Sequence, residues 1–155
     1  MDEPAERIAR QVGVEDGNLV LDLFVLQQRI GALLDDALRG TGVRPAEFAV
    51  YSQLGIDAMT PRELTARLGV TASTLTGHLA AIERRGHLRR ETDPRDRRSR
   101  RLVLTRDGRR VLTTCRRRFR KAVDSLYAEL EVDVDRAREV LREIDRAAER
   151  VISGG

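Results

Sequence analysis

A short arginine-rich stretch in the middle of the chain holds the residues best suited to chemistry. Residues 93–105 read DPRDRRSRRLVLT, with five arginines close to a turn dipeptide. Asp-Pro predicts a tight loop, because proline fixes its own φ and pushes the preceding residue out of the helical region. Leu102 and Leu104 alternate with other residues, which predicts a strand. We therefore expect a projecting basic hairpin, with strands near 88–92 and 100–105, and the polyanion that suits it best is DNA.

The charge of the chain is concentrated around this stretch. Residues 84–121 hold 17 of the 29 Arg and Lys residues against four acidic ones, a local balance of +13, whereas the rest of the chain has a balance of −9. Such polarity suits one anionic partner on one face. The alternative is a solvated arginine-rich surface, because all but one of the basic residues are arginine.

The composition excludes several classes of protein. A length of 155 residues predicts one domain, or one domain with dimerisation extensions. The single cysteine, Cys115, excludes an intramolecular disulfide and lies on the apolar side of its helix, which favours a buried, inert thiol over a redox sensor. No apolar run is long enough to cross a membrane, and the acidic N-terminus lacks the features of a signal peptide. We therefore expect a cytoplasmic protein.

Enzymatic and metal chemistry find little support. The chain has no serine-histidine-aspartate arrangement, no glycine-rich phosphate loop and no paired carboxylates in an apolar setting. His78, His87 and Cys115 lie in different predicted elements, whereas zinc needs about four grouped ligands. We expect neither an enzyme nor a cofactor or metal site.

Two short helices with strong capping signals precede the hairpin. Thr60 and Glu63 form a capping box around Pro61, which predicts a helix over 61–68 that ends at Gly69. Thr71 then caps a helix over 72–85, with Leu75, Leu79 and Ile82 facing inward. Two helices joined by so short a turn form a helix-turn-helix, and the hairpin that follows makes it a winged one.

Longer amphipathic helices flank this unit. The predicted fold is mainly α with a small β-hairpin wing: a polar N-terminal segment at 1–17, a winged helix-turn-helix domain at 44–105, and dimerisation helices at 18–40 and 106–153. The flanking helices have more apolar surface than so small a core covers, which favours an isologous dimer. A monomer with these helices folded onto the winged unit is the alternative.

The second helix of the pair is the candidate recognition helix. Its outward residues are small and hydroxyl-bearing, which permits close approach to a major groove and hydrogen bonds to base edges and phosphates. A hydrophilic solvent face is the alternative, and the adjacent arginine hairpin favours DNA contact. The helix-turn-helix residues predicted to contact DNA are Thr60, Arg62, Thr71, Ser73, Thr74, Thr76 and His78.

The order of these motifs resembles the MarR family of bacterial winged-helix regulators. The resemblance rests on LGVT at 68–71, LT at 75–76, RG at 85–86, DPRDRR at 93–98 and LVLTRDG at 102–108, and it covers about residues 45–110. It implies a homodimer with two recognition helices in successive major grooves and two wings in the flanking minor grooves.

The resemblance also assigns roles to the wing. Asp96 matches the aspartate that braces the wing, and Arg98 matches the arginine that enters the minor groove. Arg95 and Arg97 are then expected on nearby phosphates. The family often has arginine at the position of Gly77, so base contacts are expected to shift to His78 and Thr74 or to rely on DNA shape.

Many members of the family bind small aromatic or phenolic anions, which loosen DNA binding. The candidate lining for such an effector is Phe24, Phe48, Tyr51 and the start of the 106–130 helix, although such aromatics more often belong to a core. The sequence thus predicts a homodimeric, sequence-specific repressor that binds a pseudo-palindromic site in double-stranded DNA. The alternative is a winged-helix module whose basic face binds an acidic protein.

Overall fold

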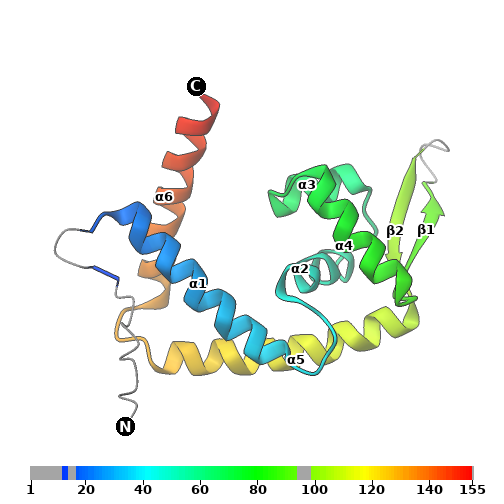
Figure 1. The fold of residues 1–155 in the computed structure, drawn as a ribbon, viewed down its shortest axis with the longest axis horizontal. Helices are drawn as coiled ribbons and strands as arrows, with labels where there is room; N and C mark the ends of the chain where they lie inside the picture. Colours follow the sequence, from blue (N-terminus) through cyan, green and yellow to red (C-terminus); the bar gives the residue numbers. More distant parts are fainter. Residues whose placement is uncertain (1–11, 14–16, 94–98, 155) are drawn as a thin grey trace, which may run out of the picture. The chain divides into compact units, whose positions relative to one another are not determined.

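The computed structural model describes residues 12–13, 17–93 and 99–154, and Figure 1 shows that they form helices and one hairpin. The elements in chain order are α1 (Leu19–Leu38), α2 (Pro45–Leu54), α3 (Pro61–Leu68), α4 (Ala72–Arg84), β1 (Leu88–Thr92), β2 (Arg100–Leu104), α5 (Arg106–Ala128) and α6 (Val134–Ser153). The predicted fold class is confirmed. The helices predicted at 61–68 and 72–85 and the strands predicted near 88–92 and 100–105 agree with α3, α4, β1 and β2 to within one residue. None of these helices combines the length and the apolarity that a membrane crossing needs.

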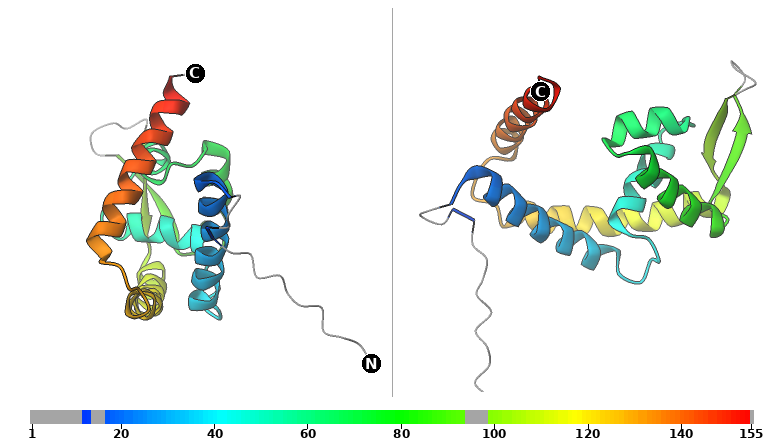
Figure 2. Two further views of the ribbon diagram at one scale, coloured as in Figure 1. Left: turned by 90° about the vertical axis from the view of Figure 1, so that its left-hand side faces the viewer. Right: turned by 45° about the horizontal axis from the view of Figure 1, so that its top comes forward.

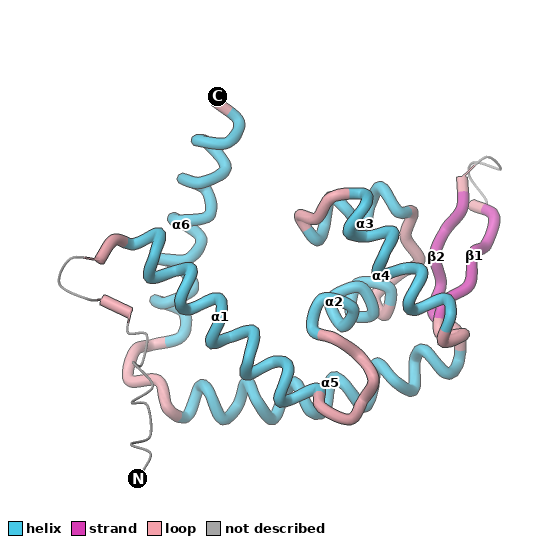
Figure 3. Tube along the Cα trace, in the orientation of Figure 1, coloured by secondary structure: helices cyan, strands magenta, loops and turns pink. Residues whose placement is uncertain are grey.

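The chain divides into two compact units within α5. The first unit ends at Phe119 and the second begins at Arg120. The first half of α5 therefore belongs to the same unit as α1 to α4 and the hairpin, while its second half belongs with α6. Figure 3 separates the helices from the two strands by colour.

The helix ends follow local sequence rules. Asn18 begins α1, and its side chain accepts a hydrogen bond from the Leu21 amide at 3.1 Å. Gly40 and Gly42 both have positive φ after the last turn of α1, as glycine permits at helix ends. Pro45 occupies the first turn of α2, where the missing N–H is not needed.

The core of the first unit is mostly aliphatic and lies between α2, α4, the hairpin and the start of α5. Phe48 contributes an aromatic contact, with its ring centroid 5.2 Å from that of Phe119 on α5. Tyr51 is fully buried. The buried hydrophobic residues are Leu38, Val43, Phe48, Val50, Tyr51, Leu54, Met59, Leu64, Leu75, Leu79, Ile82, Leu88, Leu102, Leu104, Leu112 and Cys115.

The hairpin stands beside α4, as two further views show (Figure 2). Its strands are antiparallel, with Leu88 opposite Leu104 at the base and Thr92 opposite Arg100 near the tip. Leu102 and Leu104 are buried, as their alternation predicts. Met59 adds a bridge on the other edge of β2, where the Leu102 amide donates to its carbonyl at 2.8 Å.

A glycine lets the base of the hairpin meet the start of α5. The Thr105 amide donates to the His87 carbonyl at 3.0 Å, and the Thr105 hydroxyl accepts from the Gly108 amide at 3.1 Å. A Cβ on Gly108 would lie far inside van der Waals contact of the His87 carbonyl oxygen. The glycine of the Leu-Thr-x-x-Gly sequence is therefore required at this junction for steric reasons.

Candidate nucleic-acid interface

The first helix of the pair begins as the sequence predicts. The Thr60 hydroxyl accepts from the Glu63 amide at 3.2 Å, and the Glu63 carboxylate accepts from the Thr60 amide at 2.7 Å. The bond from the Thr60 amide holds the pKa of the Glu63 carboxyl below its ordinary value. These bonds fix the first turn of α3. Arg62, which lies in that turn, is exposed.

The turn between α3 and α4 is short, and its conformation follows from a glycine and a helix cap. Gly69 has φ of +63°, the left-handed conformation that glycine adopts without strain. Two residues later, the Thr71 hydroxyl accepts from the Thr74 amide at 3.2 Å and begins α4. The predicted helix-turn-helix is therefore present, and its two helices are in contact.

One side of α4 is anchored and the other is open. Leu75, Leu79 and Ile82 are at most 3 % exposed and fix the rotation of the helix about its axis. The opposite side is therefore presented to solvent in a defined orientation. The predicted contact residues on this exposed face are Thr71, Ser73, Thr74 and Thr76, whereas His78 is half-buried.

The hydroxyls of α4 already use part of their hydrogen-bonding capacity. Thr71 Oγ1 lies 3.0 Å from Ser73 Oγ and 2.9 Å from Thr74 Oγ1, so two bonds among three hydroxyls leave one O–H group to donate outward. Thr76 donates to the Ala72 carbonyl at 2.8 Å, so its hydroxyl can contact a base only as an acceptor. In a major groove, acceptors pair with the amino groups of adenine or cytosine.

A cleft brings residues of α3 and α4 together. Its volume is about 330 Å³, and Arg62 and Thr76, both predicted DNA contacts, lie on its wall together with Arg90 of β1. The complete lining is Pro61, Arg62, Thr65, Ala72, Leu75, Thr76, Leu79 and Arg90. The aromatic residues predicted to line an effector site are elsewhere: Phe48 and Tyr51 are buried in the core, and Phe24 is exposed.

Several arginines near the hairpin hold the structure together. The Arg90 guanidinium pairs with Glu83 on α4, with Nε 2.7 Å from Oε1. Arg101 lies 3.4 Å from the buried carboxylate of Asp93 and also donates to the Ala58 carbonyl. Sequence reasoning missed these roles, because an arginine that binds phosphate and one that braces a strand look alike in a sequence.

The tip of the wing lies partly outside the described residues. The Asp93 amide donates to the Ser99 carbonyl at 3.1 Å and closes the base of the loop. The predicted bracing residue Asp96 and the predicted DNA contacts Arg95, Arg97 and Arg98 fall in the segment that the structure does not describe. Their assignments stay predictions.

A polar network fixes the far end of α4 against α2. Arg85 Nη2 donates to both carboxylate oxygens of Glu47, each at 2.9 Å, and Glu47 is only 4 % exposed. Burial alone would raise the pKa of the Glu47 carboxyl, but the bonds from Arg85 and the Arg44 amide outweigh it and lower the pKa. Nearby, the Tyr51 hydroxyl lies 2.8 Å from Nδ1 of His87.

This network makes the fold sensitive to acid at Glu47. The folded pKa lies below the ordinary value of 4.5, so the stabilisation is present above that value and is lost as the pH falls through the folded pKa. We expect Glu47→Gln to lower the free energy of unfolding at pH 7 by about 1–2 kcal/mol, less than for a fully buried pair because Arg85 is partly exposed. Urea unfolding at pH 7 and pH 4 should show that the free energy of unfolding falls less on acidification in the variant than in the wild type. An equal loss in both proteins would exclude Glu47 as the group responsible.

The remaining candidate residues do not form a reactive site. Cys115 is 1 % exposed, and burial raises the pKa of its thiol, which opposes thiolate formation. This confirms its predicted burial. Among the described residues, no group of three or more histidine, cysteine or acidic side chains is placed to hold a metal ion.

The comparisons with known proteins agree with this arrangement. Residues 41–99 match the model of the MarR family. No curated protein matches the chain. The solved structures similar to it include the transcriptional regulator MosR of Mycobacterium tuberculosis in complex with DNA, with a TM-score of 0.75 and 27% identity over 87% of this chain and 98% of that one.

Two further solved structures are similar to this chain to a comparable degree. A MarR-family transcriptional regulator from Rhodococcus sp. RHA1 has a TM-score of 0.66 and 27% identity, over 82% of this chain and 94% of that one. The repressor CouR of Rhodococcus jostii RHA1, bound to a 23-mer DNA duplex, has a TM-score of 0.72 and 25% identity, over 86% and 93% of the two chains. These relatives are transcription regulators and not enzymes. Residues 41–99 therefore match the MarR family, and the chain as a whole is similar to solved transcription regulators, two of them bound to DNA.

Proposed function

We propose that the chain is a repressor that binds a pseudo-palindromic operator as a homodimer. The observation that carries this proposal is the anchored α4, which presents Thr71, Ser73, Thr74 and Thr76 beside a basic hairpin. In this proposal Thr60 and Arg62 contact the DNA from the start of α3, and Arg95, Arg97 and Arg98 contact it from the wing. Binding to chromosomal DNA implies a cytoplasmic location.

The homodimer is supported by apolar side chains that each unit leaves exposed. On α1, Val20 is 74 % exposed and Phe24 is 54 % exposed. On α6, Val151 and Ile152 are about four-fifths exposed, and the helix has no buried residue. Large apolar side chains exposed in this way mark an interface, and a second copy of the chain satisfies it symmetrically. We therefore propose segments 18–40 and 106–153 as dimerisation helices, and half-sites about 10 bp apart.

Regulation by a small aromatic or phenolic molecule is part of the proposal. CouR has been solved with p-coumaroyl-CoA, and the DNA binding of Bordetella bronchiseptica BpsR is regulated by 6-hydroxynicotinic acid. In this chain the cleft between α3 and α4 has an apolar floor, formed by Leu75 and Leu79, and arginines at its wall. A bound aromatic anion would occupy space beside Arg62 and Thr76, which the proposal assigns to DNA.

The wing provides the test of this function. If Arg98 enters a minor groove, Arg98→Ala should weaken DNA binding by about 1–3 kcal/mol and make the slope of log affinity against log salt less negative by about 1. Fluorescence anisotropy with duplex DNA from 50 to 200 mM salt measures both quantities. Arg150→Ala, which removes an exposed arginine of α6, is the control and should change neither. Unchanged affinity in Arg98→Ala would remove the wing from the site, and a flat salt response of the wild type would contradict DNA binding.

A further inference from the structure

The first half of α5 carries a row of arginines that the proposed operator contacts do not use. Helical spacing places Arg106, Arg109, Arg110, Arg116 and Arg117 on one side, all of them exposed, and we call this set the α5 basic face. The opposite side of the same turns buries Gly108, Leu112 and Cys115. The orientation of the face is therefore fixed by the core.

Arginine-rich composition does not account for this face. The other long amphipathic helix, α6, has five basic and five acidic residues. In contrast, α5 has eight basic residues and two acidic ones. The chain thus balances arginine with carboxylates on one exposed helix and leaves it unbalanced on the other.

The imbalance has an energetic cost that the folded chain does not offset. Like charges three or four residues apart, such as Arg106 with Arg109 and Arg110, destabilise a helix. Asp107 pairs with Arg110 at 3.2 Å. In the part of the chain that the structure describes, Arg106, Arg109, Arg116 and Arg117 have no ion pair. An external polyanion would relieve the repulsion.

The chemistry of the face favours phosphate over other anionic partners. Across Arg106–Phe119 the exposed residues are charged, apart from Thr113, and no apolar side chain is exposed. Protein interfaces depend on buried aromatic or aliphatic anchors, and binding to a lipid surface needs an apolar side to insert. Nucleic-acid backbones need neither, because phosphate contacts with arginine supply most of the non-specific affinity.

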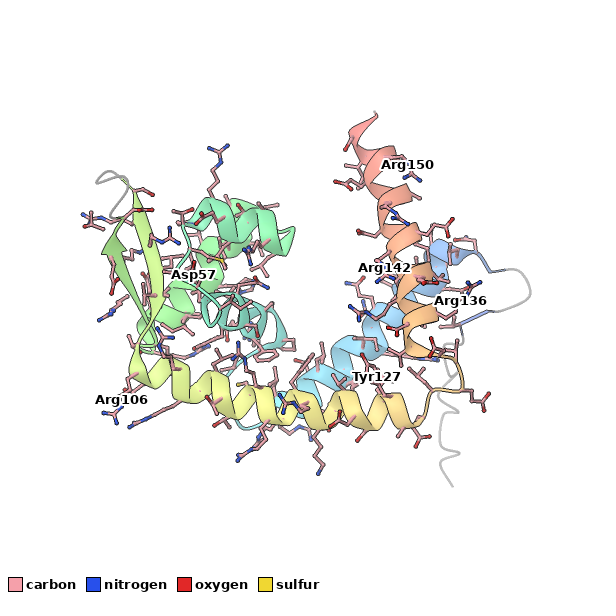
Figure 4. All side chains as sticks on the ribbon, turned by 180° about the vertical axis from the view of Figure 1, so that it is seen from behind. Asp57, Arg106, Tyr127, Arg136, Arg142 and Arg150 are labelled. Carbon is pink, nitrogen blue, oxygen red and sulfur yellow. The ribbon has the colours of Figure 1, made fainter. Side chains whose placement is uncertain are left out.

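The α5 basic face begins at the opposite end of the hairpin from the last described strand pair. The helix starts at the base of the hairpin, next to His87, whereas Thr92 and Arg100 pair four residue steps along the strands, about 13 Å away. In Figure 4, Arg106 extends from the start of α5 away from α3. A duplex held by the recognition helix and the wing tip is too stiff over so short a distance to bend back to this face.

We propose that the α5 basic face binds the phosphates of a second DNA duplex, so that one dimer bridges two segments of DNA. The proposal goes beyond operator recognition and needs no particular sequence in either duplex. Three phosphates neutralised by Arg106, Arg109 and Arg117 predict that the second binding constant falls about 40-fold between 50 and 200 mM salt.

A bridging assay tests the proposal with the full chain. A biotinylated 40-bp duplex of random sequence is immobilised, the protein is added, and capture of a fluorescent 40-bp duplex of unrelated sequence is measured at about 50 mM salt. Binding of a single duplex is measured separately by anisotropy. The test variant combines Arg106→Gln, Arg109→Gln and Arg117→Gln. The control variant removes the same charge from α6 with Arg138→Gln, Arg142→Gln and Arg146→Gln.

The expected result is that the wild type and the control capture the second duplex, whereas the α5 variant binds a single duplex normally and captures at least tenfold less of the second. Equal capture by the α5 variant would mean that two winged helices each hold a duplex, and it would overturn the proposal. The proposal would also be overturned if the wild type bound a single duplex but did not capture the second one. The same holds if the DNA-bound protein captured labelled polyglutamate, added in a parallel assay, but not the second duplex. If the wild type bound no duplex at all, the proposed function would fail as well.

Discussion

Replacing Gly108 with alanine is expected to lower the free energy of unfolding by about 2 kcal/mol. The added Cβ would press on the carbonyl of His87, which is backbone and is itself held by the Thr105 amide. Overpacking of this kind destabilises a protein by up to about 3 kcal/mol, and the better helix propensity of alanine offsets about 1 kcal/mol of that loss. Urea unfolding followed by circular dichroism measures the difference.

Gly77 provides a matched control for this substitution. It also lies inside a helix, but a Cβ at Gly77 meets no atom within 4 Å. Gly77→Ala is therefore expected to raise the free energy of unfolding by about 0.5–1 kcal/mol. Opposite signs for the two alanine variants would establish the steric role of Gly108. A neutral or stabilising Gly108→Ala would mean that the base of the wing is not packed as described.

Ser73→Glu is expected to weaken DNA binding about 100-fold while leaving the fold intact. Ser73 is exposed in the first turn of α4, where a carboxylate interacts favourably with the helix dipole. If this turn faces the DNA, the new charge meets phosphates, and a like-charge contact of about 3 kcal/mol corresponds to that loss of affinity. Anisotropy with duplex DNA and thermal unfolding separate the two effects.

Ala46→Glu is the control for charge alone. Ala46 is exposed at the equivalent position in the first turn of α2, so the two variants have the same net charge and the same type of substitution. It is expected to change DNA affinity less than threefold. If both variants lost affinity equally, overall charge rather than the face of α4 would control binding.

The local features of the fold could be predicted from the sequence because their causes are local. The capping box of Thr60 and Glu63 and the left-handed turn at Gly69 each depend on residues within a few positions. The alternation that buries Leu102 and Leu104 is also visible in a short window. These features were sufficient to predict the helix-turn-helix and its wing.

Contacts between distant residues could not be predicted in the same way. Glu47 and Arg85 are 38 positions apart, and Tyr51 and His87 are 36 apart. In one sequence, nothing distinguishes Arg85, which braces α4, from Arg109, which has no ion pair with any residue that the structure describes. The aromatic residues show the same limit, since Phe48 is in the core and Phe24 is exposed.

The central claim is that the chain recognises a specific operator as a symmetric dimer. Selection of bound duplexes from a random DNA pool, at about 150 mM salt to suppress non-specific phosphate binding, tests it most directly. The expected result is enrichment of an inverted repeat with half-sites about 10 bp apart. If folded protein enriched no sequence, operator recognition would be ruled out and an acidic protein would be favoured as the partner of the basic wing.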